Sequence, residues 1–192
     1  MPTAIVKLKS VSPYSQSRYL LESRGSNEAP DDFEKRIWRD RAHVMEVGPD
    51  KGKVFIPPMA FKQSLDAGAK YASIQIPGKG KATYTKHTKS GVLVSEPLVL
   101  PIKKEDLAYY AGPMSSTGEK GGAGGKVVIR IYPMILEWEG EVTYHILDEV
   151  ITPAAFEQML TVAGRNIGIG RFRPQNGGFN GRYSVEKVDW VD

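Results

Sequence analysis

Residues 152–191, TPAAFEQMLTVAGRNIGIGRFRPQNGGFNGRYSVEKVDWV, predict a helix, a glycine-rich loop and a strand in that order. Thr152 is a residue type that caps helix N-termini, Pro153 suits the first helical position, and Gly164 suits a helix end. The segment from Tyr183 onward is β-prone, so we expect a terminal strand there. Within the helix, apolar residues recur at helical spacing and form one face: Phe156, Met159, Leu160 and Ala163.

Upstream of this helix, two β-prone runs predict a long hairpin. The runs are Lys126–Trp138 and Glu141–Val150, and a Glu-Gly pair separates them. Pro133 lies midway along the first run, which predicts a bulge or an edge position there. Residues 114–125, MSSTGEKGGAGG, have the composition of a mobile connection.

The N-terminal part of the chain begins with a strand and a turn. Thr3–Val11 is rich in β-formers, and the Ser-Pro pair that follows ends the strand because proline has no N–H for the ladder. A short helix is expected around Asp32–Trp38, and Lys53–Ile56 predicts a short strand.

A second helix follows Pro57 and is expected to end near Ala72. Its apolar residues fall on one face, namely Met59, Phe61, Leu65, Ala69 and Ala72. Residues 76–91, IPGKGKATYTKHTKSG, predict an exposed loop or a flexible hairpin, and Val92–Leu100 predicts a strand.

Reduced to its core, this order is strand, helix, strand, strand, helix, strand. It predicts an α+β fold, a ferredoxin-like or RRM-like palm with both helices on one face of an antiparallel sheet. We expect a single domain over residues 1–192 that carries inserted loops and a hairpin, with insertions at about 14–52, 77–91 and 112–126.

Composition places the chain among ordinary globular proteins. Hydrophobic residues make up 41% and charged residues 25%, which argues against global disorder. No apolar run of about 18 residues is present, so we expect no membrane span, and no secretory signal is visible. Cysteine is absent and the three histidines lie far apart, which predicts no disulfide, no metal and no other cofactor. These features are compatible with a cytoplasmic protein.

Positive charge is concentrated in two segments that contain no acid. The net charge is +4 and the sequence pI is about 9.1. Pro77–Gly91 carries His87 and four lysines, and Gly164–Tyr183 carries four arginines. Segregated charge of this kind suits a polyanion, although solvated loops kept basic for solubility are the alternative. The candidate nucleic-acid contacts in these segments are Lys79, Lys81, Lys86, Lys89, Arg165, Arg171, Arg173 and Arg182.

The arginine segment holds every component needed to grip a single nucleic-acid strand. Its glycines let the backbone approach a ligand and point free amides at phosphate oxygens, and arginine adds a planar fork that matches phosphate. Phe172 and Phe179 offer faces for base stacking at about 1–3 kcal/mol per base, but Phe172 can equally pack into the core beside Ile169. Gly168 and Gly170 are no dinucleotide fingerprint, because they follow a helix and no third glycine stands at the required spacing.

Three stretches together resemble the RAMP superfamily, the repeat-associated proteins of CRISPR systems. They are VKLKSVSPYS at 6–15, FIPPMAFKQSLDAGAKY at 55–71 and FEQMLTVAGRNIGIGRFRPQNGGFNGRYSV at 156–185. The likeness is closest to the backbone subunit that coats guide RNA, it covers about half of the chain, and the final run is its most specific part. The chain is short for such a subunit, which leaves open a stand-alone or phage-encoded relative.

This resemblance implies head-to-tail association of copies, contacts with other effector subunits, and sequence-independent binding of single-stranded RNA along a ferredoxin-like palm. It also implies a protruding hairpin that inserts between bases, for which Pro77–Gly91 is the candidate. Carried onto this sequence, it supports Arg165, Arg171 and Arg173 and adds Ser12, Tyr14 and Lys62 as RNA contacts. Arg18 is a further candidate contact.

RNA coating competes with three further hypotheses. Some RAMP relatives cut RNA, and here Asp40 and His43 would serve a metal-independent endoribonuclease. A surface ion pair of Asp40 with a neighbouring arginine is the favoured interpretation, and His87 and His145 are assigned to the phosphate surface and to a strand, so we expect no enzyme. The second hypothesis is a phage or mobile-element protein that coats single-stranded DNA, and the third is a protein-only mimic of a backbone subunit.

Overall fold

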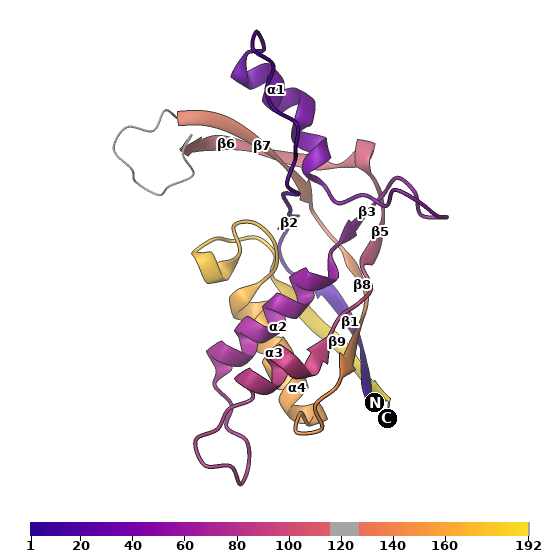
Figure 1. The fold of residues 1–192 in the computed structure, drawn as a ribbon, viewed down its shortest axis with the longest axis vertical. Helices are drawn as coiled ribbons and strands as arrows, with labels where there is room; N and C mark the ends of the chain where they lie inside the picture. The colour runs from indigo at the N-terminus through magenta and orange to yellow at the C-terminus, as the bar shows by residue number, and fades with distance from the viewer. Residues whose placement is uncertain (116–126, 192) are drawn as a thin grey trace.

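The computed structural model describes residues 1–115 and 127–191, and its palm is a four-stranded antiparallel sheet in the order β4-β8-β1-β9 (Figure 1). The strands in that order are Val92–Leu93, Glu139–Ile146, Thr3–Ser10 and Tyr183–Val191. Every second residue of β1 is fully buried, namely Ala4, Val6 and Leu8. The face of the sheet that these side chains occupy therefore carries the core.

Two helices, α2 (Pro58–Ala72) and α4 (Pro153–Val162), cover that face and pack against each other. Thr152 caps α4 as expected, because its Oγ1 accepts a hydrogen bond from the Ala155 amide at 3.3 Å. The helices approach closely at Gly68, where an added Cβ would lie 2.6 Å from the Ala163 Cβ. The order β1, α2, β4, β8, α4, β9 confirms the predicted α+β, ferredoxin-like palm.

A second, three-stranded sheet stands beside the palm and corrects one prediction. Strand β7 (Val127–Ile135) pairs with β6 (Ala108–Ser115) and with β2 (Tyr14–Ser15), so it does not form a hairpin with β8. The chain changes sheets at Trp138, which is buried beside Phe61 and exchanges backbone and hydroxyl hydrogen bonds with Ser10. Pro133 pairs only with β6, because β2 ends opposite Met134, so its missing N–H faces no strand.

The basic segment after α2 is more ordered than expected. Residues Thr85–Gly91 form helix α3, with Thr88 fully buried, where a loop or flexible hairpin was predicted. The strand predicted over residues 92–100 is divided: β4 joins the palm, and β5 (Leu98–Lys103) pairs with β3 (Lys53–Ile56) in a separate two-stranded sheet. Both strands bury side chains in the core, Val92 from β4 and Leu98 and Leu100 from β5. They do so from two different sheets.

The segment predicted as an insertion at residues 14–52 holds β2, helix α1 (Pro30–Ile37) and a 3-10 turn at Trp38–Arg41. Further short turns are the 3-10 turns Lys104–Asp106 and Pro174–Asn176 and a π-helical turn at Ala163–Ile167. Of the segment predicted at 112–126, residues 116–126 lie outside the described part of the chain. No described helix is long and apolar enough to cross a membrane.

Glu34 fastens α1 to the second sheet through a buried ion cluster. Its side chain belongs to a residue that is only 3% exposed, and its carboxylate accepts hydrogen bonds from Arg41 at 2.6 and 2.9 Å and from Arg130 at 2.6 Å. It also accepts one from the Ile131 amide at 3.1 Å. Two arginines therefore share one buried carboxylate, so this cluster carries a net positive charge.

Replacing Glu34 with glutamine is expected to lower the free energy of unfolding by about 3–5 kcal/mol, because it leaves buried arginine charge unpaired. Burial alone would raise the pKa of Glu34, but the hydrogen bonds from Arg41, the Ile131 amide and Arg130 lower it. The stabilisation is therefore present above the unfolded pKa of about 4.3 and is lost as pH falls through the lower folded pKa. Urea unfolding of wild type and variant at neutral and acidic pH measures this. Equal stability at neutral pH would contradict the prediction.

Candidate nucleic-acid interface

The turn after β1 and the loop before β9 form one structure, although they lie at opposite ends of the chain. We call residues 164–182 the glycine loop. The Val11 amide donates to the Arg182 carbonyl, the Gly181 amide to the Pro13 carbonyl, and the Arg171 amide to the Ser15 carbonyl, each at 2.8 Å. These bonds fix the glycine loop on the end of β1.

The Ser12 side chain links the turn after β1 to the glycine loop. Its hydroxyl donates to the Phe179 carbonyl and accepts from the Arg182 amide, both at 2.9 Å, and the residue is 3% exposed. Tyr14 is 2% exposed, and burial raises the pKa of its hydroxyl. Both were expected to contact RNA, and that expectation stays a prediction. In the structure both side chains are buried, and Ser12 bonds to the glycine loop.

Positive backbone dihedrals let the glycine loop lie close to this turn. Gly170 has φ +75° and Gly181 has φ +77°, and an added Cβ at either would overlap a backbone carbonyl oxygen, that of Ser15 or of Ile169. Phe172 adopts φ +54° without being glycine, and its carbonyl accepts a hydrogen bond from the Asn180 amide at 2.9 Å. A bulky side chain in this region signals backbone strain, which concentrates at functional sites.

Arg171 is a half-buried cation that forms no ion pair with any carboxylate in the part of the chain that the structure describes. Its guanidinium carbon lies 3.6 Å from the Tyr132 ring centroid and 5.2 Å from that of Phe172, and one nitrogen contacts the Met114 sulfur at 3.9 Å. Its Nε is buried without a hydrogen-bond partner. Burial lowers the pKa of Arg171, Tyr132 opposes this, and nearby Arg41 lowers it further. The arrangement orients the guanidinium, and none of the described carboxylates pairs with it.

The other arginines of the glycine loop share this lack of acidic partners. Arg165 is exposed, and Arg173 is half-buried with an unpartnered Nε. Arg182 donates to the backbone carbonyls of Arg165 at 3.2 Å and Phe179 at 3.1 Å. Across residues 1–115 and 127–191, none of the four forms an ion pair with a carboxylate. Segregated arginines of this kind can bind an external anion.

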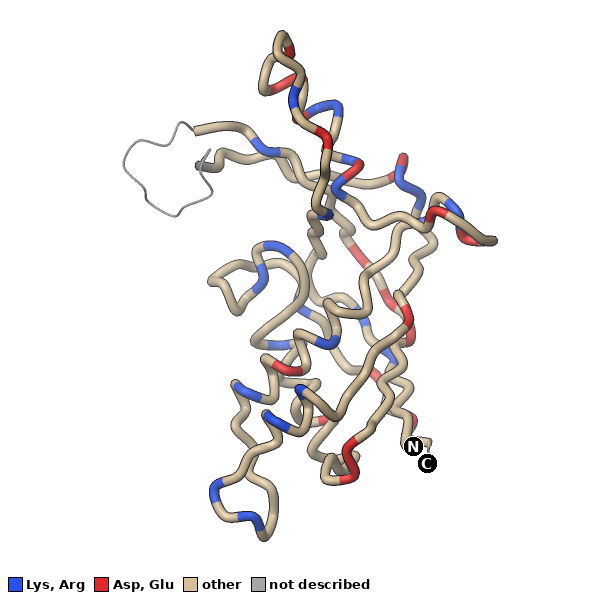
Figure 2. The backbone as a smooth tube through the Cα atoms, viewed as in Figure 1, with Lys and Arg blue, Asp and Glu red and all other residues tan. Residues whose placement is uncertain are grey.

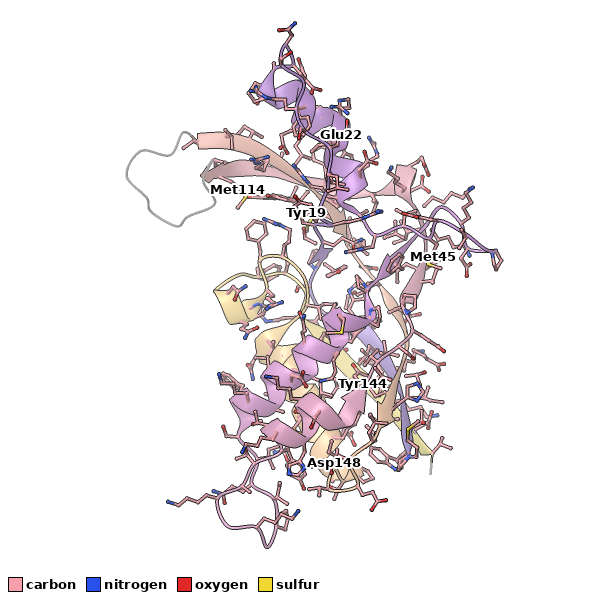
Figure 3. The ribbon with its side chains drawn as sticks, in the orientation of Figure 1. Tyr19, Glu22, Met45, Met114, Tyr144 and Asp148 are labelled. Carbon is pink, nitrogen blue, oxygen red and sulfur yellow. The ribbon has the colours of Figure 1, made fainter. Side chains whose placement is uncertain are left out.

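The hairpin of β6 and β7 faces the glycine loop and supplies aromatic rings that the sequence reasoning missed. The Phe172 ring stands edge-on to Tyr110 at 6.1 Å and to Tyr132 at 6.4 Å. Figure 3 shows Met114 projecting from this hairpin toward the glycine loop. Tyr110 is 49% exposed and Phe179 is 66% exposed, so faces for base stacking remain open on both sides. The sequence did hold a signal for this hairpin, because its described strands contain tyrosines and no acidic residue. That composition suits contact with a nucleic acid.

The remaining predicted contacts lie elsewhere. Lys62 is 7% exposed, pairs with Asp66 at 2.6 Å and donates to the carbonyls of Thr88 and Lys89. Its ammonium is therefore used within the protein, and its expected RNA contact stays a prediction. Arg18 pairs with Glu46 at 3.3 Å. The hairpin and helix after α2 lie at the lower end of Figure 1, below the glycine loop, and carry the other predicted contacts, Lys79, Lys81, Lys86 and Lys89.

The histidines and Asp40 have partners within the protein. Asp40 pairs with Lys104 rather than with a neighbouring arginine. His43 packs on Phe55 at 5.5 Å, and its pKa is lowered by burial and by Arg18. His87 bonds Asp148 at 2.6 Å, which corrects its assignment to the phosphate surface.

Sequence comparison identifies no relative: no protein-family model and no curated protein sequence matches the chain. Structure comparison finds chains of similar fold. A chain in the cryo-EM structure of the Type III-B Cmr-beta bound to cognate target RNA matches over 100% of this chain, with TM-score 0.55 and 11% identity. Cmr6 from Pyrococcus furiosus matches over 96% of this chain and 99% of its own, with TM-score 0.48 and 13% identity.

The matched chain of the Cmr-beta structure is longer, since the present chain covers 61% of it. At 11% identity the likeness is one of fold. It shows that the α+β fold of this chain also occurs in a chain of the Cmr-beta structure. The resemblance to the RAMP superfamily in the three sequence stretches stays a prediction.

Proposed function

We propose that the protein binds single-stranded RNA without sequence preference, with phosphates on the arginines of the glycine loop and bases against the facing aromatics. The observation that carries this proposal is Arg171, a half-buried guanidinium that packs against two rings and forms no ion pair with a carboxylate within residues 1–115 and 127–191. A phosphate supplies the missing anion, and Tyr110 and Phe179 supply stacking faces next to it.

The open face of the palm is a poor alternative site. RRM-type sheets bind RNA through aromatics on their open face. Here Tyr144 and Tyr183 are buried toward the helices, and the open face pairs Lys7 with Glu141 and Lys9 with Glu139 across β1 and β8. A surface of alternating charge has no net attraction for phosphate, which favours the glycine loop.

Fluorescence anisotropy with two unrelated single-stranded RNAs of about 16 nucleotides tests the proposal. We expect equal affinities that fall with salt, the logarithmic slope being about −0.7 per phosphate neutralised. A slope near zero, or strong preference for one sequence, would overturn it. Matched DNA strands in the same titration distinguish an RNA-binding protein from one that coats single-stranded DNA.

We also propose that copies associate head to tail along a guide RNA, as repeated subunits beside other effector subunits, and that they do not cut it. The partners of Asp40, His43 and His87 within the fold support a non-catalytic role. RNA left intact after long incubation with near-stoichiometric protein is expected. Sedimentation on RNAs of increasing length should add one copy per site length.

A further inference from the structure

A second basic surface stands apart from the glycine loop. The lysine surface, as we call it, consists of four exposed residues, none of which pairs with a carboxylate in the described chain: Lys79, Lys81, Lys86 and Lys89. Figure 2 shows Lys and Arg positions on the loop that projects from the lower end of the molecule and on the helices above it. The glycine loop lies at the opposite end of α2 and α4 in the same view.

The lysine surface is built on rigid supports. A bridge between Gln75 and Thr83 and a hydrogen bond from the Ile76 amide to the Ala82 carbonyl at 2.9 Å close the projecting loop into a small hairpin. Ile76 and Tyr84 anchor its base in the core, at 5% and 2% exposure. Its lysines are therefore presented from a fixed frame.

Two acids close to this surface already bond to groups outside the four lysines. Asp66 accepts the Lys62 ammonium, and Asp148, labelled in Figure 3, accepts hydrogen bonds from His87 at 2.6 Å and from the Val150 amide at 3.0 Å. These bonds lower the pKa of Asp148. None of the four lysines forms an ion pair with these two acids, and a polyanion is a partner that such a cluster of lysines fits.

The two basic surfaces differ in chemistry. The glycine loop combines arginine with aromatic rings, whereas residues 73–91 contain no arginine, and Tyr84, their one aromatic residue, is buried. Single strands are held by base stacking, while duplex RNA hides its bases and is bound through its backbone. Lysine is a compact point charge that suits such backbone contacts.

We infer that the lysine surface binds the phosphate backbone of duplex RNA, at a site separate from the single strand on the glycine loop. The inference rests on the proposed function only in taking RNA as the ligand. It gives the protein two binding modes with different sensitivities to mutation.

The test measures anisotropy with a blunt RNA duplex of about 16 base pairs and with a single strand of about 16 nucleotides. The variant K79Q/K81Q/K86Q/K89Q is expected to weaken duplex binding about tenfold or more and to reduce its salt slope, with single-strand binding changed by less than about twofold. The control K7Q/K9Q/K51Q/K103Q removes the same charge from other exposed positions. Unchanged thermal unfolding verifies that both variants fold.

The outcomes separate the two proposals. Duplex binding that survives in the quadruple variant, or falls equally in the control, overturns the inference. Equal loss of single-strand and duplex binding overturns it too, because the lysines then belong to the single-strand path. A wild-type protein that binds the single strand but no duplex refutes the inference alone, and one that binds neither refutes the proposed function as well.

Discussion

Replacing Arg171 and Arg173 with alanine is expected to weaken single-stranded RNA binding by about 3 kcal/mol or more, roughly a 100-fold loss of affinity. Each arginine is expected to neutralise one phosphate, so the salt slope should fall by about 1.4 in magnitude. The loss should be the same for every RNA sequence, because phosphate contacts carry no base information.

Arg171 also packs on Tyr132, so the alanine variant alone confounds binding with folding. Arg171→Lys with Arg173→Lys keeps both charges while removing the planar fork, and it should retain the salt slope but bind more weakly than wild type. Arg24→Ala with Arg39→Ala is the matched control, since both residues are exposed and lie outside the glycine loop. If the control loses as much affinity as the loop variant, binding depends on net charge, and the glycine loop is not the RNA-binding site.

Elements with local signals were predicted well from the sequence. Strand β1, helices α2 and α4 and strand β9 each carry their own boundaries in a Ser-Pro turn, a paired proline start or a glycine stop. These boundary signals act within a few residues and need no tertiary partner. The order of these elements was sufficient to predict the palm.

Elements whose neighbours are distant in the sequence were not predicted well. Strands β7 and β8 look like one hairpin because both are β-prone and a turn separates them. What places them in different sheets is the burial of Trp138 against Phe61 of α2 and Tyr183 of β9. Both residues are far from Trp138 in the sequence. Helix α3 has little helical signal, and it forms where Thr88 is buried and Gly91 packs against Asp148.

For the site, residue types pointed to the place but not to the role of each side chain. Ser12 and Lys62 belong to stretches that resemble RNA-binding proteins, yet both are used internally. Lys62 had a visible structural reason, because Asp66 lies one helical turn away and such pairs stabilise helices. The contribution of the β6–β7 hairpin depends on a contact across about sixty residues, from Tyr110 to Phe172, which a single sequence does not reveal.

Gly181→Ala is expected to destabilise the protein strongly. Gly181 is buried with φ +77°, and an added Cβ would overlap the Ile169 carbonyl oxygen, which cannot move because it is backbone. The left-handed conformation alone costs alanine about 1–2 kcal/mol, and the overlap should bring the loss to about 4 kcal/mol or more. Thermal unfolding should shift down by about 8 °C or more for a chain of this size.

Gly177→Ala is the matched control, because Gly177 has φ +75° but nothing lies within 4 Å of its added Cβ. It should cost only the backbone penalty, about 1–2 kcal/mol, and leave RNA binding close to wild type. Gly181→Ala should also lose RNA affinity, because Gly181 donates to Pro13 and its displacement releases the arginines from the end of β1. Equal unfolding temperatures for the two variants would show that backbone conformation, rather than close packing on the Ser-Pro turn, is what requires glycine there. In that case the close packing of the glycine loop on the end of β1 would not be what positions the arginines for phosphate contacts.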